Sequence, residues 1–334
     1  MWFKFKSDSP AEIERKAREQ AAVEALTRGD ILPRARHRIE HQLAQKTKLY
    51  STDMTTKEFL LSEECDIEPL GQVMGTCFYT IENFPVPNFR SQENMMLAHG
   101  HMTARTNAVE RMKKEAKLYG ADGIVSVRIK MKEQPGFGGS LIEFTAIGTA
   151  VKVNGWEPED LDKEPFTSEL NGQEFWQLIH AGYRPVNIAF GICSYYINSD
   201  QWTLPLVRTG IFFSRANQEI EQWTEGMYTA RDLAMSRMQK ELEDSGSDGC
   251  VGMTVNCELR EVEYERANLQ YVDLLATFTA IGSSIKKMKR PHKEIKRKPL
   301  TVLNLGSKSF VTLGDRLDEL RGTVEEDDFM GAYD

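Results

Sequence analysis

Residues 92–125 of this chain occur a second time, 126 positions later, at 218–251. Fifteen of the 34 paired positions are identical, and no gap is needed. The flanks repeat too: Gly75-Thr-Cys77-Phe-Tyr79 returns as Gly191-Ile-Cys193-Ser-Tyr195, and Phe144-Thr-Ala-Ile-Gly148 returns as Phe278-Thr-Ala-Ile-Gly282. A repeat of this length predicts two copies of one structural unit. A chemical role essential to the unit is therefore expected in both copies.

Chain length, net charge and the number of cysteines limit the class of protein. A chain of 334 residues suits two domains, each large enough for its own core. The net charge of −8 argues against broad affinity for nucleic acid or anionic membranes. The N-terminus lacks the apolar stretch of a signal peptide, and no window approaches 18 uninterrupted apolar residues. Five Cys without regular spacing suit free thiols in a reducing compartment, so we expect a cytoplasmic protein.

Each copy is predicted to run strand, helix, strand, strand. In the first copy we expect a strand over 68–81, a helix over 92–119 that Gly100 interrupts, a strand from 124 to 132 and a closing strand over 141–153. Gly226 is expected to interrupt the second helix in the same way. One helix on three antiparallel strands cannot hide both faces of a sheet, so association with other units is expected.

Two patterns predict which residues face the core. Small or apolar residues recur every four positions along the first helix, at Ala104, Ala108, Met112 and Ala116, which predicts a stripe that packs closely on a sheet or another subunit. In the strand that follows, Val125, Val127, Ile129 and Met131 alternate with polar residues and are predicted to share one face.

The domain organisation follows from these units and from the segments around them. Residues 1–50 form a basic helical extension with helices predicted near 10–28 and 33–46, and little shared core is expected there. The first unit covers 57–153, a polar linker 154–164 and the second unit 165–288, which a short helix over 166–180 opens. The tail, 289–334, continues a basic run of residues 286–298 and ends in an acidic stretch.

The segment Ala116–Lys152, AKLYGADGIVSVRIKMKEQPGFGGSLIEFTAIGTAVK, resembles the YbjQ-like family of heavy-metal-binding proteins. The strand 67–76, IEPLGQVMGT, is similar to the first strand of that family. The second copy departs more, since Gly246-Ser-Asp248 replaces Gly-Ala-Asp and Gly282-Ser-Ser284 replaces Gly-Thr-Ala. The resemblance covers roughly residues 57–153 and 165–288, in tandem, and neither extension.

This resemblance implies an α+β fold of two tandem dodecin-like β-α-β-β units, each with one helix packed on an antiparallel sheet. It also implies assembly into a closed homo-oligomeric ring, typically a pentamer. A soft or borderline metal such as Zn or Cu is the cofactor that the family implies. The helical N-terminal and mixed C-terminal extensions lie outside the resemblance and are candidates for docking a protein partner.

Candidate metal ligands gather at the start of the first helix. Met95, His99, His101 and Met102 lie within eight residues and offer thioether and imidazole groups, which suit Cu(I) or Zn. Two rings in a His-x-His pair point about 200° apart on a helix, so they converge only if Gly100 breaks it. The second copy has Glu225 and Met227 in place of the two His. Met residues packed at an interface are the alternative interpretation.

Cys77 and Cys193 occupy matched positions on the first strand of each copy. They are thiolate candidates if a ring brings them together. Buried small hydrophobic residues are the alternative, since Cys is among the most buried residue types.

Other motifs favour structure over catalysis. His37-Arg-Ile-Glu40-His41 spells the H-x-x-E-H pattern of inverted zinc peptidases, but three nearby arginines and the lack of a third ligand make chance the better explanation. Arg105 and Arg111 recur in the second copy as Arg231 and Arg237, which makes them candidates for bound anions or ion pairs between units. Glu115 and Glu241 are expected to form surface pairs with the arginines four residues before them.

No nucleophile-and-base set appears in both copies, so conserved catalysis has no visible basis. The sequence predicts a non-enzymatic, ring-forming binding or scaffold protein whose main partner is itself. The alternative is a small-molecule sensor or an enzyme with a pocket between subunits.

Overall fold

The computed structural model describes residues 9–45, 50–52, 54–82, 90–136, 139–200, 202–203, 218–266 and 269–289. The helices are α1 (Pro10–Thr27), α2 (Pro33–Ala44), α3 (Thr56–Glu64), α4 (Met95–Tyr119), α5 (Gly172–His180) and α7 (Glu221–Asp244), with a 3-10 turn η1 (Pro158–Asp160). The strands are β1 (Ile67–Glu82), β2 (Gln92–Glu93), β3 (Gly123–Gly136), β4 (Gly139–Val153), β5 (Phe166–Thr167), β6 (Tyr183–Ile197), β7 (Gly249–Arg266) and β8 (Leu269–Lys287).

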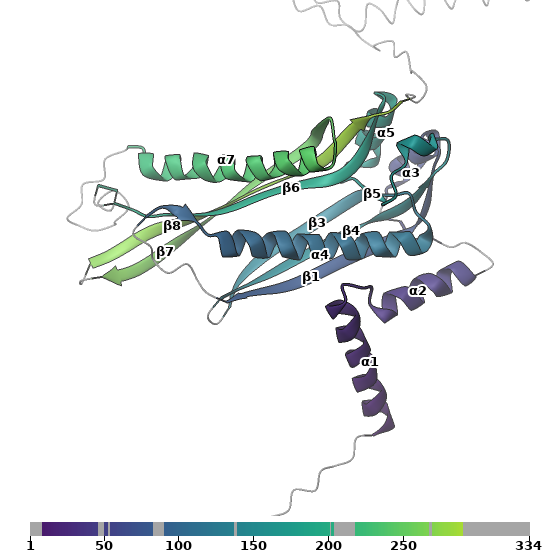
Figure 1. Cartoon of the computed structure of the whole chain (residues 1–334), viewed down its shortest axis with the longest axis horizontal. Coiled ribbons are helices and arrows are strands. Elements are labelled where there is room, and N and C mark those ends of the chain that lie inside the picture. The colour runs from purple at the N-terminus through teal and green to yellow at the C-terminus, as the bar shows by residue number, and fades with distance from the viewer. Residues whose placement is uncertain are drawn as a thin grey trace, which may run out of the picture. The chain divides into compact units, whose positions relative to one another are not determined.

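The described residues form a mixed α+β fold, as the sequence predicted, but each of the two sheets has four strands where three were expected. One sheet has the order β1-β4-β3-β5 and the other β2-β6-β8-β7. We call β1, α4, β3 and β4 the first half, and β6, α7, β7 and β8 the second half. Figure 1 shows α4 along β1 and α7 along β6.

Each half contributes a short strand to the sheet of the other. β2 precedes α4 in the chain but pairs with β6, where Gln92 lies opposite Tyr196. β5 precedes the second half but pairs in parallel with β3, where Phe166 lies opposite Gly123. The sequence predicted neither strand, because two residues are too few to show a period.

The helix of each half lies directly on the backbone of a strand. Ala104, Ala108, Met112 and Ala116 are fully buried, so the predicted stripe is confirmed. A Cβ on Gly75 of β1 would lie 1.8 Å from the Ala108 carbonyl oxygen, and only glycine permits this contact.

The second half repeats the contact. A Cβ on Gly191 of β6 would lie 2.1 Å from the carbonyl oxygen of Ala234 on α7. Gly75 and Gly191 are matched positions of the repeat, so both helices are seated by the same means.

The predicted helix breaks at Gly100 and Gly226 are wrong, since α4 and α7 run continuously through them. These glycines make room for a side chain instead of ending a turn. A Cβ on Gly100 would lie 2.3 Å from Cδ1 of Ile81, and one on Gly226 would lie 2.4 Å from Cδ1 of Ile197.

The predicted alternation along β3 is also wrong at its start. The pairing with β4 shifts between Val125 and Arg128, and Ser126 has a φ of 53°, so a β-bulge inserts one extra residue. Val125 and Val127 therefore enter different apolar clusters. β7 has the same shift between Val251 and Thr254, with Gly252 at a φ of 66°.

The two halves share one core. Ile188, Phe190 and Ile192 of β6 join the apolar cluster of α4 and the first sheet. The ring of Phe190 meets that of Phe144 on β4 edge to face, with centroids 6.0 Å apart. Cys193 and Ile197, also on β6, pack with Ala230 and Ala234 of α7. The sheet of the second half is thus covered by α7 on one face and, along β6, by the first half on the other.

The segments around the halves are better packed than expected. α1 begins with the predicted capping box of Ser9 and Glu12. The expectation of little core was wrong for α2, because Ile39 is fully buried in the main cluster. α3, which was not predicted, begins with a second capping box, Thr55 and Glu58.

The predicted linker also contributes to the core, since Trp156 is buried and stacks on Phe166. The helix expected over 166–180 begins only at Gly172, after the Asn171 cap, and β5 takes the start of that range. The expectations for residues 290–334 lie outside the described residues. Among the described helices, none is both long and apolar enough to cross a membrane.

We predict that Gly75→Ala destabilises the fold by about 3 kcal/mol, because the methyl group must push α4 off β1. The control is Gly249→Ala, whose new Cβ would meet nothing within 4 Å and should cost no more than about 0.5 kcal/mol. Denaturant unfolding measures both. Equal stability of the two variants would contradict the seating role of Gly75.

Candidate functional site at the junction of the halves

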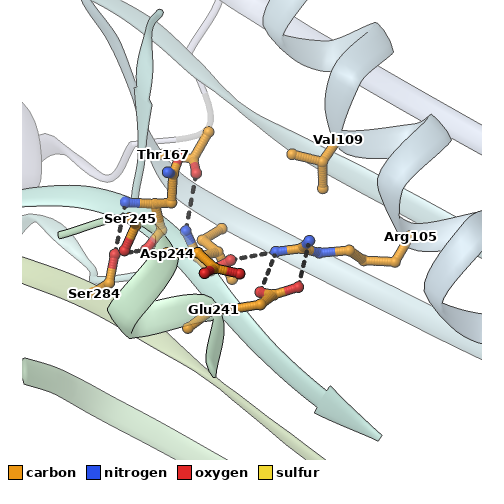
Figure 2. A pocket seen from close by; sticks show the side chains of 10 residues that line it. Arg105, Val109, Thr167, Glu241, Asp244, Ser245 and Ser284 are labelled. Atoms are coloured by element: carbon orange, nitrogen blue, oxygen red, sulfur yellow. Dashed lines mark hydrogen bonds and ion pairs between the residues drawn. The ribbon is translucent and has the colours of Figure 1, made fainter. Parts of the chain in front are cut away.

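A cavity of about 300 Å³ with a mixed polar and apolar lining lies where α4, β6 and α7 meet. Its lining includes Arg105, Thr167, Glu241, Asp244, Ser245 and Ser284, which Figure 2 shows around one opening. The residues come from both halves and from β5. The cavity therefore exists only when the halves are packed together.

Arg105 is the central side chain of this junction. Its Nη1 lies 3.2 Å from Oε1 of Glu241 and its Nη2 lies 3.2 Å from Oε2. The two contacts form a bidentate ion pair between α4 and α7. Nη2 also donates to the Ile188 carbonyl of β6. The guanidinium carbon lies 5.7 Å from the centroid of the Phe190 ring. Burial lowers the pKa of Arg105 and the Glu241 carboxylate raises it, so a charged guanidinium is held in place by its partner.

Glu241 ties three elements together. Besides Arg105, its Oε2 accepts a hydrogen bond of 3.0 Å from the backbone N–H of Phe190. The predicted Arg237–Glu241 surface pair is therefore wrong, because the carboxylate points to β6 and α4. Arg237 instead donates to the Ile192 carbonyl at 2.6 Å and pairs with Glu93 of β2.

The first half has the same arrangement. Arg111 donates to the Thr76 carbonyl at 2.6 Å, as Arg237 does to Ile192. The carboxylate of Glu115 accepts from the N–H of Met74 at 3.0 Å and pairs with Arg38 of α2, so the predicted Arg111–Glu115 pair is also wrong. Of the arginines kept in both copies, Arg105, Arg111 and Arg237 each bind a strand carbonyl, whereas Arg231 pairs with its neighbour Asp232.

Lys113 adds a second positive charge near the junction. Its Nζ donates to the Asn187 side-chain oxygen at 2.6 Å. Burial lowers the pKa of Lys113, and the charge of Arg105 lowers it further. This polar junction can orient a small group that carries both hydrogen-bond donors and acceptors.

The predicted metal ligands are divided between different surroundings. Met95, His99 and Met102 line one cavity of about 290 Å³ beside Arg237, Lys240, Glu241 and Asp244 of α7. His101 is buried elsewhere, with Nε2 3.4 Å from Oε2 of Glu133 on β3. Because α4 is continuous at Gly100, the two imidazoles diverge, as the helix geometry requires.

The two cysteines lie in different sheets. Cys77 on β1 is buried, with its Sγ 3.8 Å from the Asn107 side-chain nitrogen. Cys193 on β6 is fully buried, and burial together with the Glu93 carboxylate raises the pKa of its thiol to about 12. It is therefore a protonated thiol at neutral pH, whereas a soft metal takes a thiolate.

These residues do not fit a closed metal site. In the part of the chain that the structure describes, no three His, Cys, Asp or Glu side chains are grouped to hold an ion. The cavity of Met95 and His99 is lined by two cationic and two anionic side chains of α7, so these charges offset one another and give no net attraction for a cation. The metal ligands therefore stay a prediction, and no chemical step is derived from them.

Glu133 forms a second tie between the halves, which the sequence did not predict. Its Oε1 accepts from Ser140 at 2.8 Å and from Arg260 of β7 at 3.1 Å, while Oε2 faces His101. Burial alone would raise the pKa of Glu133, but the hydrogen bonds of His101 and Ser140 and the charge of Arg260 lower it to about 2. The sequence holds no signal for this contact, because the matched position of the second copy is Leu259.

Comparison with known proteins supports the family resemblance found in the sequence. The family model YbjQ_1, described as "Putative heavy-metal-binding", matches residues 88–154, which include α4, β3 and β4. The resemblance stated from the sequence is thus confirmed for this segment of the first half.

The chain is also 36% identical over 216 residues to "Encapsulin nanocompartment protein Rv1762c" of Mycobacterium tuberculosis (strain ATCC 25618 / H37Rv). The aligned region covers 64% of this chain and 79% of that protein. The chain belongs to the family of this protein. No solved structure matches the chain.

We predict that Arg105→Ala lowers the free energy of unfolding by about 3 kcal/mol, because it leaves Glu241 without its partner at the junction. A double-mutant cycle with Glu241→Gln should show a coupling of about 1–3 kcal/mol. The matched control is Arg231→Ala, measured at a dilution where the protein is a single chain. This arginine of α7 is 48% exposed, and its contacts among the described residues are with Asp232 and Tyr228 of its own helix. Similar losses for Arg105→Ala and Arg231→Ala would contradict the assignment.

The pH dependence of stability should report Glu133. Its folded pKa of about 2 lies below the ordinary 4.5, so its contribution is complete above pH 4.5 and is lost as the pH falls toward 2. The stability advantage of the wild type over Glu133→Gln should shrink across this window. A difference between the two proteins that does not change with pH would refute this role.

Proposed function

We propose that this chain is a non-enzymatic, self-assembling component of a protein nanocompartment. Its copies would associate head to tail through the same kind of contact that joins its two halves. The relative is named as a nanocompartment protein, which supports a role in such a compartment. One structural observation supports the head-to-tail mode of assembly. Apolar residues that correspond to the buried junction are exposed at the two outer faces of the chain.

The contact between the two halves shows which positions of two neighbouring chains would have to meet in a contact of the same kind. On the second half it uses the face of β6 that carries Phe190, which lies opposite Ile281 of β8. On the first half it uses α4, Phe144, Ile129 and the residues beside them. Ile129 lies opposite Ala146, two residues before Gly148.

The first half exposes the equivalent of the β6 face. Met74 of β1 lies opposite Ile147, as Phe190 lies opposite Ile281, and it is 46% exposed. Phe78, on the same face of β1, is 62% exposed. Apolar side chains at such positions are typical of a surface that another protein covers.

The second half exposes the equivalent of the other side. Val255 of β7 lies opposite Ala280, two residues before Gly282, and therefore matches Ile129. It is 46% exposed, and Met253 and Leu259 on the same strand are 49% and 57% exposed. The two exposed faces of the chain are therefore different, and they correspond to the two sides of its internal junction. A head-to-tail contact requires two such different, complementary faces.

This geometry supports the finer proposals made from the sequence. We propose that the halves are tandem dodecin-like units and that head-to-tail contacts close into a ring, most simply of five chains. A closed ring leaves neither face exposed, whereas an open array leaves one at each end. The junction cavity keeps the alternative of a small-molecule sensor open, because an equivalent cavity would form at each contact between chains.

We predict that native mass spectrometry at micromolar concentration shows multiples of the 38.1 kDa chain. Met253→Glu with Val255→Glu should shift the distribution to single chains without unfolding them, because charges replace an apolar contact on an exposed strand. The control is Val23→Glu on α1, which is 61% exposed and lies outside both faces.

Assembly of the double variant like the wild type would place the contact elsewhere. The same spectra test the metal prediction. A stoichiometric metal that His99→Ala loses would support it, and a metal-free wild type after loading with Zn or Cu would remove it.

A further inference from the structure

Helix α2 is bound to the first half through Arg38, Ile39 and Gln42. Arg38 donates from Nη1 to the Gln72 carbonyl at 3.3 Å and from Nη2 to Oε2 of Glu115 at 3.1 Å. Ile39 is fully buried in the cluster beneath. One turn further, Gln42 accepts from the Tyr119 hydroxyl at 2.7 Å.

The second half binds α4 with the same acceptor groups. Arg105 donates to the Ile188 carbonyl and to Glu241. Gln72 and Ile188 each lie three residues before the glycine that seats the helix, and Glu115 and Glu241 each lie seven residues after the alanine that it contacts.

In both halves the glutamate also accepts from the strand N–H two residues after that carbonyl, at 3.0 Å in each case. Arg38 and Arg105 therefore occupy equivalent sites, although Arg38 lies outside the repeated sequence.

A third arginine of this kind lacks such a site. Arg231 of α7 is the repeat equivalent of Arg105. It is half-exposed, contacts its neighbour Asp232 at 2.8 Å and lies over the ring of Tyr228, which is itself 56% exposed. Among the residues that the structure describes, no further half offers it a carbonyl and a glutamate.

We infer that the surface formed by the Gln72 carbonyl, the Met74 N–H and the Glu115 carboxylate is the docking site for α7 of a second copy, with Arg231 as the inserted group. We call it the arginine-acceptor surface. This inference rests on the proposed self-assembly and adds that α2 competes for the same surface. Charge complementarity and continuity with the junction support a second copy as the partner.

The competition has a direction that the chain itself sets. α2 is tethered to the surface that it covers, so its local concentration is on the order of millimolar. α7 of another copy has to displace it and gains the contact of β7 with β1 in return. Association of the full chain is therefore weaker than that of a chain whose α2 is released.

The test compares release of α2 with removal of its competitor. Arg38→Glu with Ile39→Ser, the release variant, repels Glu115 and removes the apolar anchor. Sedimentation velocity over a concentration series should show at least about tenfold tighter association than the wild type. Adding Arg231→Glu to the release variant should abolish that gain. The matched control, Arg18→Glu with Val23→Ser, changes exposed residues of α1 and should associate like the wild type.

The outcomes separate the two proposals. If a folded release variant associates no more tightly than a wild type that assembles through Met253 and Val255, self-assembly stands and the competition is overturned. If wild type and release variant both remain single chains, both proposals fall. If the release variant does not fold, a peptide of residues 29–45 is added to wild-type assemblies. It should dissociate them while the same peptide with the two substitutions does not, and equal lack of effect overturns the competition.

Discussion

The contact of a helix carbonyl with a strand glycine determines most of this structure. With Gly75 beneath Ala108 and Gly191 beneath Ala234, each helix lies as close to its strand as backbone atoms allow. Only at this separation does the glutamate seven residues later reach a strand N–H, as Glu115 and Glu241 do. Arg38 and Arg105 in turn bind these glutamates. The close packing at one glycine in each half therefore positions the polar groups that join the elements.

The polar ties and the apolar contacts serve different purposes. Phe144, Phe190 and Ile188 supply the area that holds the halves together, at roughly 25 cal/mol for each Å² removed from water. The Arg105–Glu241 pair adds less net energy, because both groups lose solvation when they are buried. It does select the relative register of α4, β6 and α7, since a guanidinium that misses its two acceptors is left buried and unpaired.

How much was predictable follows from the kind of signal each feature leaves. The Ala104–Ala116 stripe and the Ser9 cap are local patterns, and the structure has them where the sequence placed them. The bulge at Ser126 was missed because one inserted residue shifts the strand phase without changing composition. Gly100 was assigned to a helix break because its real reason, the side chain of Ile81, lies on a distant strand. Of the candidate site, the sequence identified Arg105 and Arg237 but not their acceptors, which only the tertiary structure brings near.

The exchange of β2 and β5 between the sheets has a consequence for how the chain becomes native during synthesis. A ribosome releases the first half before the second, yet the first sheet lacks its last strand until Phe166 and Thr167 have emerged. Gln92 and Glu93, although made early, wait for a β6 that is translated about a hundred residues later. The nascent first half is therefore an unfinished sheet with a dangling segment, and it reaches its final form only together with the second half.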